Sequence, residues 1–387
     1  MKILMVSMVS IHFTRWVAQL KDSGHDVYWF DPLDGNYENK QLNWLHYCKR
    51  WRLRWNFPGR YFIKNKLPWL YRLIQRINER PIDKAFEAYL QEVQPDVVHS
   101  FVLQSGTLPL VEIMQKQTEM PWVYSAWGND LYFRQKNEKD LRGIQYTLPH
   151  IDFMFADCSR DYFLAKQCGF QGVYLGTFPT GGGYELNKYT PFLKDWNVRK
   201  TFLVKGYQGK LGRCNKVLEA LSQLQKELLD FNIVVFGAND LVKYASVSLG
   251  LSNWKNFTIY EQLSHNEVLR LMGESKIYIG NSISDGMPNT MLEAILMEVF
   301  PIQSNPGGAT EELIADGVNG LLLKNPEDAN DIAEQIKRAI QGTILLENAV
   351  KHNSQHIKPY LEREYIQKQV LDAYKTIERS TNQPDEC

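Results

Sequence analysis

Two carboxylates flank the start of a predicted helix within residues 280–294. Asp285 lies in a polar loop after a short apolar run, and Glu293 follows eight positions later. We expect the helix to begin around residues 288–290, with Asn289 as its cap. The N–H groups and positive dipole end of such a helix would hold a phosphate, while the carboxylates would accept hydrogen bonds from sugar hydroxyls. The simpler alternative is that both acids only complement the helix dipole.

A second glycine loop follows the next apolar run, and we expect it to open a second helix. Its two adjacent glycines would let the backbone approach a ligand closely. Two successive strand, glycine-loop and helix units favour a binding site over simple capping. The residues predicted to contact the ligand in these two loops are Gly286, Met287, Pro288, Asn289, Thr290, Gly307 and Gly308.

A third loop carries the cations Lys205, Lys210 and Arg213 among three glycines, between an apolar run and a helical segment. Glycines, cations and a helix N-terminus together suit a diphosphate. An ordinary solvated loop fits the same pattern equally well. The glycines are spaced G-x-x-G-x-x-G, which differs from the G-x-G-x-x-G pattern of dinucleotide-binding domains.

Short apolar runs separated by helix-length segments must position these loops, and this alternation predicts parallel sheets covered on both faces. The expected fold class is therefore α/β, with two doubly wound Rossmann-like domains facing across a cleft. A stretch rich in glycine and proline, 176–199, predicts a hinge between a first domain, 1–175, and a second, 200–358. Residues 359–387 should form a helix that returns to the first domain, then a polar tail. The twelve predicted strands are 2–7, 27–30, 96–101, 122–125, 153–157, 172–175, 201–205, 232–236, 257–259, 277–280, 300–304 and 320–323.

The overall composition excludes several classes of protein. Hydrophobic residues make up 44% and charged residues 23%, so the chain can bury a core. Lys plus Arg number 44 and Asp plus Glu 44, which argues against a uniformly basic nucleic-acid binder. The five cysteines form no C-x-x-C pair, which favours buried thiols in a reducing compartment over disulfides or zinc. No apolar run reaches membrane-spanning length. We expect an intracellular protein, soluble or peripheral, that requires no metal or cofactor.

The charge is unevenly distributed, because residues 40–80 contain eleven basic residues and one acid, together with nine aromatics. Interleaved aromatic rings and cations are typical of elements that lie on anionic membranes. Two alternatives remain open: an aromatic stripe packed on the core beneath a basic face, and a surface for single-stranded nucleic acid. No nucleic-acid module is visible elsewhere, so the sequence favours membrane contact.

Residues 277–323 resemble the signature region of the family 4 retaining glycosyltransferases, which adopt the GT-B fold. That family carries two glutamates in the register of Asp285 and Glu293, then a Gly-Gly loop, then a run like residues 312–320. Asp285 stands where the family has its first glutamate. The first strand also lacks the family's following glycine pair, and Trp127-Gly-Asn-Asp130 replaces a His-Gly-type loop.

The resemblance implies transfer of a sugar, with retention, from a nucleotide diphosphate sugar to a glycan or lipid-linked acceptor. Cell-surface polysaccharide synthesis on the inner face of the membrane would fit. Glu293 would then hold ribose hydroxyls, Asp285 donor sugar hydroxyls, and Lys205 and Arg213 the leaving diphosphate. In the first domain, His12 and Asp130 are candidates for sugar or acceptor contacts. A nucleotide-sugar epimerase of the same fold and an inactive nucleotide-sugar-binding protein remain alternatives.

Overall fold

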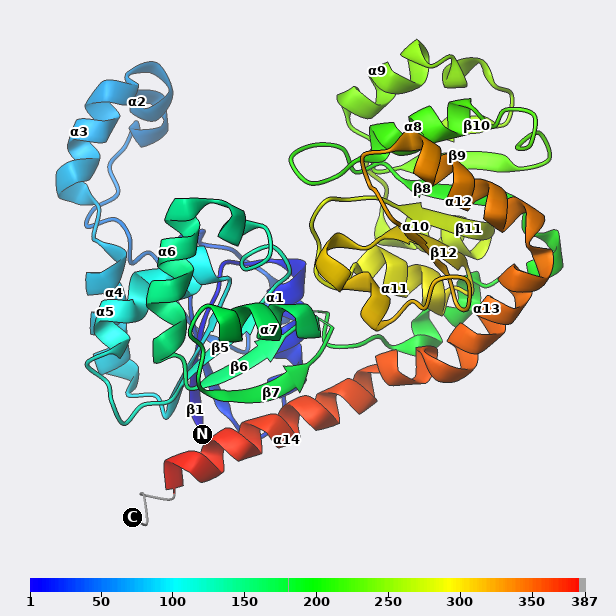
Figure 1. Ribbon diagram of the computed structural model, residues 1–387. Coiled ribbons are helices and arrows are strands. Elements are labelled where there is room, and N and C mark those ends of the chain that lie inside the picture. The colour runs from blue at the N-terminus through cyan, green and yellow to red at the C-terminus, as the bar shows by residue number, and fades with distance from the viewer. Residues whose placement is uncertain (180, 383–387) are drawn as a thin grey trace. The chain divides into compact units, whose positions relative to one another are not determined.

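The computed structural model describes residues 1–179 and 181–382, in which the chain forms two compact units, each built on a parallel sheet (Figure 1). The first unit contains Met1–Ala156, Asp161–Gly182 and the chain from Lys368 on. The second contains Asp157–Arg160 and Gly183–Gln367. The division between Gly182 and Gly183 lies in the segment predicted as a hinge. Thr180 of that segment lies outside the described residues, as do residues 383–387 of the predicted tail 380–387, whereas residues 380–382 of that tail are the last of a helix.

The first unit has a seven-stranded sheet of order β3-β2-β1-β4-β5-β6-β7, in which all neighbours are parallel. Apolar side chains on both faces of its central strands are buried, which explains their continuous apolar sequences. The strands are β1 Lys2–Val6, β2 Asp26–Phe30, β3 His46–Cys48, β4 Val97–Phe101, β5 Trp122–Ala126, β6 Phe153–Ala156 and β7 Val173–Thr177.

Six of these strands overlap predicted runs, and the sequence missed only β3. This edge strand is three residues long and lies within the basic aromatic block, where no apolar run marks it. The helices that begin in the first unit are α1 Ile11–Val17, α2 Arg60–Lys66, α3 Pro68–Asn78, α4 Ile82–Val93, α5 Val111–Met114 and α6 Glu138–Thr147. Helix α7, Ser159–Gln167, begins in the short segment that belongs to the second unit.

The second unit has a six-stranded parallel sheet of order β10-β9-β8-β11-β12-β13, with β11 between β8 and β12. Every strand overlaps a predicted run. The strands are β8 Thr201–Lys205, β9 Asn232–Phe236, β10 Phe257–Ile259, β11 Ser275–Gly280, β12 Phe300–Ser304 and β13 Leu321–Leu323. The helices are α8 Cys214–Ser222, α9 Asp240–Ser248, α10 His265–Gly273, α11 Asn289–Leu296, α12 Ala329–Gln341 and α13 Thr343–His356.

The last helix, α14 Arg363–Asn382, begins in the second unit, and its residues from Lys368 on belong to the first. Its buried Tyr374 fixes it there, because the phenol oxygen lies 2.6 Å from Nδ1 of the buried His99 on β4. Within the described ranges, no helix combines the length and apolar character that a membrane span requires.

Two local predictions were wrong. The loop after β12 opens no α-helix, but forms two single 3₁₀ turns, Pro306–Gly308 and Thr310–Glu312. Gly307 and Gly308 both have positive φ, which a continuous right-handed helix cannot contain. Asn289 is not the cap of α11, because Pro288 occupies that position and Asn289 is already helical. Its side chain instead accepts a hydrogen bond from the hydroxyl of Tyr184 at 2.7 Å.

Candidate functional site

Three loops meet at the carboxyl ends of β8, β11 and β12 in the second unit, where open parallel sheets bind their ligands. These are the cation loop 206–213, the carboxylate loop 281–288 and the glycine loop 305–312. The N–H of Arg213 donates to the carbonyl of Asn281 at 3.0 Å, and Ile283 donates to Leu211 at 2.9 Å. The N–H of Ser282 donates to the hydroxyl of Ser304 at 2.9 Å, which joins β12 to the same cluster.

The two predicted acids follow β11, which carries the buried Tyr278. Burial raises the pKa of Tyr278, and the negative charges of Asp285 and Glu293 raise it further. Strand β11 ends at Gly280, Asp285 follows in the next loop, and Glu293 lies on α11 directly after that loop. The structure therefore brings the two predicted acids together at the end of one strand.

Glu293 has a partner that the sequence did not reveal. Its Oε1 atom lies 2.8 Å from Nε2 of His265, the first residue of α10. The Glu293 side chain is 10% exposed and the His265 side chain 48%. The imidazole therefore lies on the solvent side of the Glu293 carboxylate and restricts its orientation. The two residues are 28 positions apart, so no local spacing could have indicated the pair.

Arg213 is held by its own loop. Its Nε donates to Glu327 Oε1 at 2.8 Å, while its Nη1 donates to the carbonyls of Gly209 and Gly212 at 3.1 and 2.9 Å. The guanidinium thereby braces the cation loop in a closed turn. A diphosphate at this site would have to compete with the carboxylate of Glu327 for the same cation.

The two lysines predicted to bind the diphosphate, Lys205 and Lys210, lie in different environments. The ammonium of Lys205, at the end of β8, lies 5.4 Å from the centre of the Tyr207 ring. Burial raises the pKa of Tyr207, and the nearby charge of Asp285 adds to the effect. Lys205 therefore lies beside the Tyr207 ring, and Lys210 is exposed.

Arg160 connects the carboxylate loop to the glycine loop. Its buried Nη1 donates to the carbonyl of Asp285 at 2.9 Å and to that of Pro306 at 2.6 Å. Glu312, at the end of the glycine loop, accepts from the backbone N–H groups of Ser159 and Arg160 at 2.7 and 2.9 Å. Arg160 thus fixes the spacing of two predicted ligand loops. No local pattern indicates this role, since Arg160 lies 125 residues before Asp285.

Two glycines of the site allow close approaches. A Cβ atom at Gly286 would lie 2.1 Å from the Asp157 carboxylate, and one at Gly280 would lie 2.2 Å from Gln303 Oε1. Met287 and Pro288 are buried, whereas Thr290 is half-buried on the first turn of α11. Four buried oxygens here have no hydrogen bond in the described structure: Asn281 Oδ1, Ser282 Oγ, Gln303 Oε1 and Tyr278 Oη. A buried oxygen of this kind calls for an explanation such as a bound water, an ion or a catalytic role.

Asp130 and His12, the two residues of the first unit predicted to contact the sugar or the acceptor, lie in different environments. Asp130 is 2% exposed, and its carboxylate accepts from the Tyr124 hydroxyl at 2.6 Å and from the N–H groups of Leu103 and Trp127 at 3.0 and 3.1 Å. It therefore anchors the loop after β5. His12, in the first turn of α1, lies with its ring centre 5.8 Å from that of Trp127.

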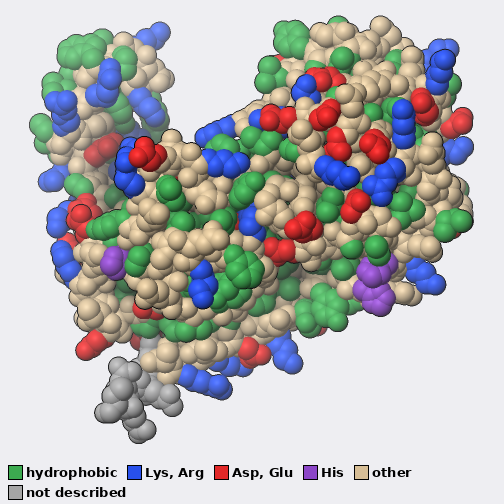
Figure 2. All heavy atoms as spheres, viewed as in Figure 1, with side chains coloured by type: hydrophobic (Ala, Val, Ile, Leu, Met, Phe, Trp, Pro, Cys, Tyr) green, Lys and Arg blue, Asp and Glu red, His purple; other side chains and the backbone are tan. Residues whose placement is uncertain are grey.

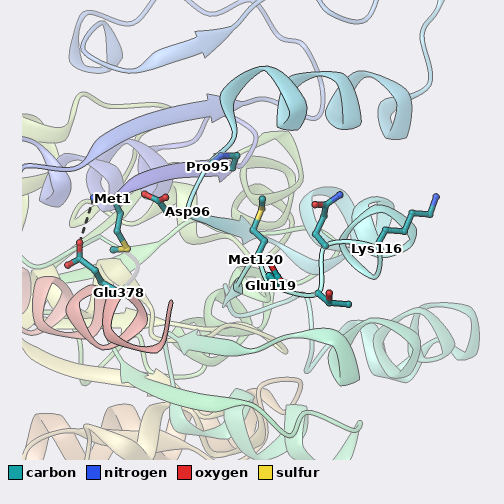
Figure 3. Close-up of a pocket in the computed structure, with 9 residues that line it drawn as sticks. Met1, Pro95, Asp96, Lys116, Glu119, Met120 and Glu378 are labelled. Atoms are coloured by element: carbon teal, nitrogen blue, oxygen red, sulfur yellow. Dashed lines mark ion pairs between the residues drawn. The ribbon is translucent and has the colours of Figure 1, made fainter. Parts of the chain in front are cut away.

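A cavity of about 540 Å³ in the first unit lies at the amino ends of strands in that unit's sheet (Figure 3). It is lined at the amino ends of β1 and β4 by Met1 and Asp96, and by Glu378 of α14. The terminal ammonium and Glu378 form an ion pair at 3.8 Å, drawn dashed in Figure 3. Because parallel sheets bind ligands at their carboxyl ends, this cavity is a poor candidate for the active site.

Comparison with known families places the three loops in one recognised domain. Residues 199–356 match the family model described as Glycosyl transferases group 1. An uncharacterized glycosyltransferase of Methanocaldococcus jannaschii is 27% identical over 212 residues, which cover 52% of each chain. The chain thus spans about half the length of this curated relative. All predicted ligand residues of the second unit lie within the matched range.

Solved structures resemble the chain over nearly its full length. Anabaena HepE in complex with UDP has a TM-score of 0.69 and 14% identity, and covers 97% of this chain and 100% of its own. The lipopolysaccharide outer core galactosyltransferase WaaB has a TM-score of 0.65 and 16% identity, covering 97% and 99%. At these identities the likeness shows the fold alone. The chain has the GT-B fold of two Rossmann-like domains.

Proposed function

We propose that this protein is a retaining glycosyltransferase of family 4 that uses a nucleotide diphosphate sugar. The observation that carries the proposal is that the loops with Lys205, Asp285 and Glu293 meet at one end of the second sheet, inside the range that matches Glycosyl transferases group 1. The UDP and UDP-glucose complexes of the structurally similar HepE support a nucleotide sugar as donor. Retention of configuration follows only from the family resemblance.

In this proposal, the second unit holds the donor through hydrogen bonds and charge. Glu293 receives the ribose hydroxyls on Oε2, because His265 occupies Oε1 and Oε2 makes no hydrogen bond within the described part of the chain. Asp285 receives hydroxyls of the donor sugar. Both carboxylates act as acceptors, for which ionised oxygens are well suited.

The chemical step breaks the bond between the anomeric carbon of the sugar and the diphosphate oxygen, and its electron pair leaves with the nucleoside diphosphate. A hydroxyl oxygen of the acceptor bonds to the same carbon, and its proton passes to the departing diphosphate. Lys205, Arg213 and the N-terminus of α11 stabilise the charge that develops on the diphosphate, commonly the largest contribution to catalysis. Lys210, the backbone of residues 286–290 and the pair Gly307–Gly308 complete the donor site. The proposal requires no metal.

The acceptor in this proposal is a glycan or a lipid-linked molecule held by the first unit, in a pathway of cell-surface polysaccharide synthesis. WaaB, described as a lipopolysaccharide outer core galactosyltransferase, shares the fold and supports such an acceptor. His12 stays a candidate for acceptor contacts. Asp130 can act only through the loop that it anchors, because three donors already occupy its carboxylate. We place the protein in the cytoplasm, in peripheral contact with anionic membrane through the exposed part of residues 40–80.

Product analysis tests this function. The protein is incubated with UDP-, GDP-, ADP- and dTDP-sugars, first alone and then with lipid-linked and free glycan acceptors. The proposal predicts slow hydrolysis of one donor alone and faster transfer with an acceptor, with the anomeric configuration kept. Interconversion of the donor without an acceptor would instead identify an epimerase, and binding without turnover an inactive binding protein.

A further inference from the structure

The basic aromatic block divides into two parts with different environments. The first part is core: Trp51 is 6% exposed, its indole N–H donates to the carbonyl of Asp31 at 2.8 Å, and its ring stacks on Phe30. Tyr47, on β3, stacks on Trp29 with ring centres 4.0 Å apart. These aromatics therefore pack on the sheet of the first unit. For this part of residues 40–80, the aromatic side chains belong to the core, which was one of the alternatives left open by the sequence.

The second part is the helical hairpin formed by α2 and α3, Arg60–Asn78, which stands clear of the first unit's sheet (Figure 1). Helix α2 buries none of its residues, and α3 buries only Gln75 and Asn78. Figure 2 shows hydrophobic and basic side chains side by side over these helices. The large apolar side chains exposed on the hairpin are Tyr61 at 68%, Phe62 at 65%, Leu67 at 38%, Trp69 at 62%, Leu73 at 52% and Ile77 at 68%.

The exposed apolar residues of α3 form one ridge. Trp69, Leu73 and Ile77 are four positions apart, a spacing that places side chains above one another on the same helix face. Arg72 and Arg76 each precede a ridge residue by one position and share the same spacing, so a row of cations runs beside the apolar row. A helix normally turns such a ridge toward a core. Here it faces solvent.

The hairpin is held firmly at its base. Asn78 is fully buried; its Oδ1 accepts from the N–H of Trp55 at 2.9 Å, and its Nδ2 donates to the carbonyl of Trp55 at 3.0 Å. The N–H of Arg54 donates to the Asn78 carbonyl at 2.8 Å, and that of Arg80 to the Arg52 carbonyl at 2.7 Å. This two-stranded neck presents the ridge in a defined orientation.

We propose that the α2–α3 hairpin is a docking element for the surface of an anionic phospholipid membrane. Residues 60–78 contain five cations and no carboxylate, so the charge of the hairpin complements anionic headgroups. The ridge inserts at the boundary of headgroups and acyl chains, where tryptophan and tyrosine are favoured. Arg72 and Arg76 lie beside the ridge at headgroup level.

Helix α9 of the second unit provides an internal contrast. It also exposes three apolar side chains, Leu241 at 55%, Tyr244 at 73% and Val247 at 65%. Its cation Lys243, however, is paired with Asp240 at 2.8 Å and with Glu261 at 2.6 Å. This apolar patch lacks the positive charge that an anionic surface would attract, so membrane docking is assigned to the hairpin and not to α9.

Flotation of the full chain with vesicles tests the docking element. Vesicles of phosphatidylcholine with about 30% phosphatidylglycerol should carry the wild type to the top of a density gradient, and vesicles of phosphatidylcholine alone should carry much less. The triple variant Trp69→Gln, Leu73→Gln, Ile77→Gln should stay at the bottom. Because these side chains are exposed, thermal unfolding of the variant should match that of the wild type.

Two further variants separate charge from apolar area. Arg72→Gln with Arg76→Gln should lower the vesicle partition coefficient roughly 25-fold, since each cation contributes about fivefold, equivalent to about 1 kcal/mol. The matched control, Leu241→Gln, Tyr244→Gln and Val247→Gln on α9, should float like the wild type. The proposal is overturned if the wild-type protein does not float with anionic vesicles, or if the hairpin variants float as the wild type does. It is also overturned if the protein binds single-stranded RNA but does not float. The assay needs no glycosyl donor, so its failure leaves the proposed enzymatic function untouched.

Discussion

The carboxylate of Glu293 and the imidazole of His265 lie 2.8 Å apart, from Oε1 to Nε2, at the edge of the three ligand loops. The carboxylate stands on the second turn of α11, and the imidazole on the first residue of α10. The pair orients Glu293 so that one oxygen is engaged and the other is available to a ligand. In the proposed function, His265 is therefore a positioning residue for the donor.

We expect His265→Ala to raise the KM for the donor about two- to fivefold while kcat changes less than twofold. The half-exposed pair orients Glu293 but does not touch the bond that breaks, and its contribution of about 1 kcal/mol or less is typical of partly exposed ion pairs. Steady-state kinetics with varied donor give both constants. His265→Gln, which can still donate to Glu293, should recover most of the affinity. An equal fall of kcat in both variants would contradict this role.

Arg160 should determine the spacing of the carboxylate and glycine loops. In Arg160→Met the carbonyls of Asp285 and Pro306 lose a buried donor, and each unsatisfied group costs about 1–3 kcal/mol. We expect a lower melting temperature and a fall in kcat/KM of at least tenfold. Arg142→Met, which removes an exposed ion pair with Glu138, is the control and should change neither. If the Arg160→Met variant had wild-type kinetics, Arg160 would not position these loops for the reaction.

Arg213 can be tested together with the carboxylate that holds it. If the guanidinium stabilises the leaving diphosphate, Arg213→Ala should lose at least tenfold in rate, about 1.4 kcal/mol or more of the barrier. Glu327→Gln removes only the ion pair at 2.8 Å with a 60% exposed partner, and should change the rate less than threefold. Equal losses in the two variants would show that Arg213 works only by closing its loop.

The pH dependence of stability should reflect the buried His99. Burial lowers the pKa of His99 well below its usual 6.5, so the unfolded chain binds a proton that the folded chain does not. The free energy of unfolding therefore falls as the pH drops below about 6.5, by up to about 1.4 kcal/mol per pH unit, and this contribution is constant above that pH. The melting temperature of His99→Gln should fall less between pH 7.5 and 5.5 than that of the wild type. His150→Gln, at an exposed position, should keep the wild-type slope.

The fold was largely predictable because its strands are buried on both faces. Continuous apolar runs marked twelve strands, whereas β3 is a short edge strand whose residues carry no such signal. The helix after Asp285 was predictable from local pattern. The 3₁₀ turns after β12 were not, since the positive φ of Gly307 and Gly308 depends on the surrounding chain.

The candidate site was predictable only where its residues lie close together in the sequence. Asp285 and Glu293 are eight positions apart, and the sequence placed them together. His265 and Arg160 reach the site from 28 and 125 residues away, so only the packing of the chain reveals them. The basic block was ambiguous for a similar reason. The same aromatic types serve as core at Trp51 and as exposed ridge at Trp69, and composition cannot separate the two.

Every step of the proposed function requires that Glu293 and its neighbours in the second unit bind a nucleotide diphosphate sugar. A thermal-shift titration with UDP-, GDP-, ADP- and dTDP-sugars measures this binding, since a ligand at 100 times its Kd stabilises the folded chain by about 2.7 kcal/mol. We expect at least one donor to raise the melting temperature of the wild type, Glu293→Gln to abolish the rise, and Glu347→Gln on the exposed face of α13 to keep it. A Glu293→Gln protein that responds to the donor as the wild type does, or a wild type that responds to none of these donors, would contradict it.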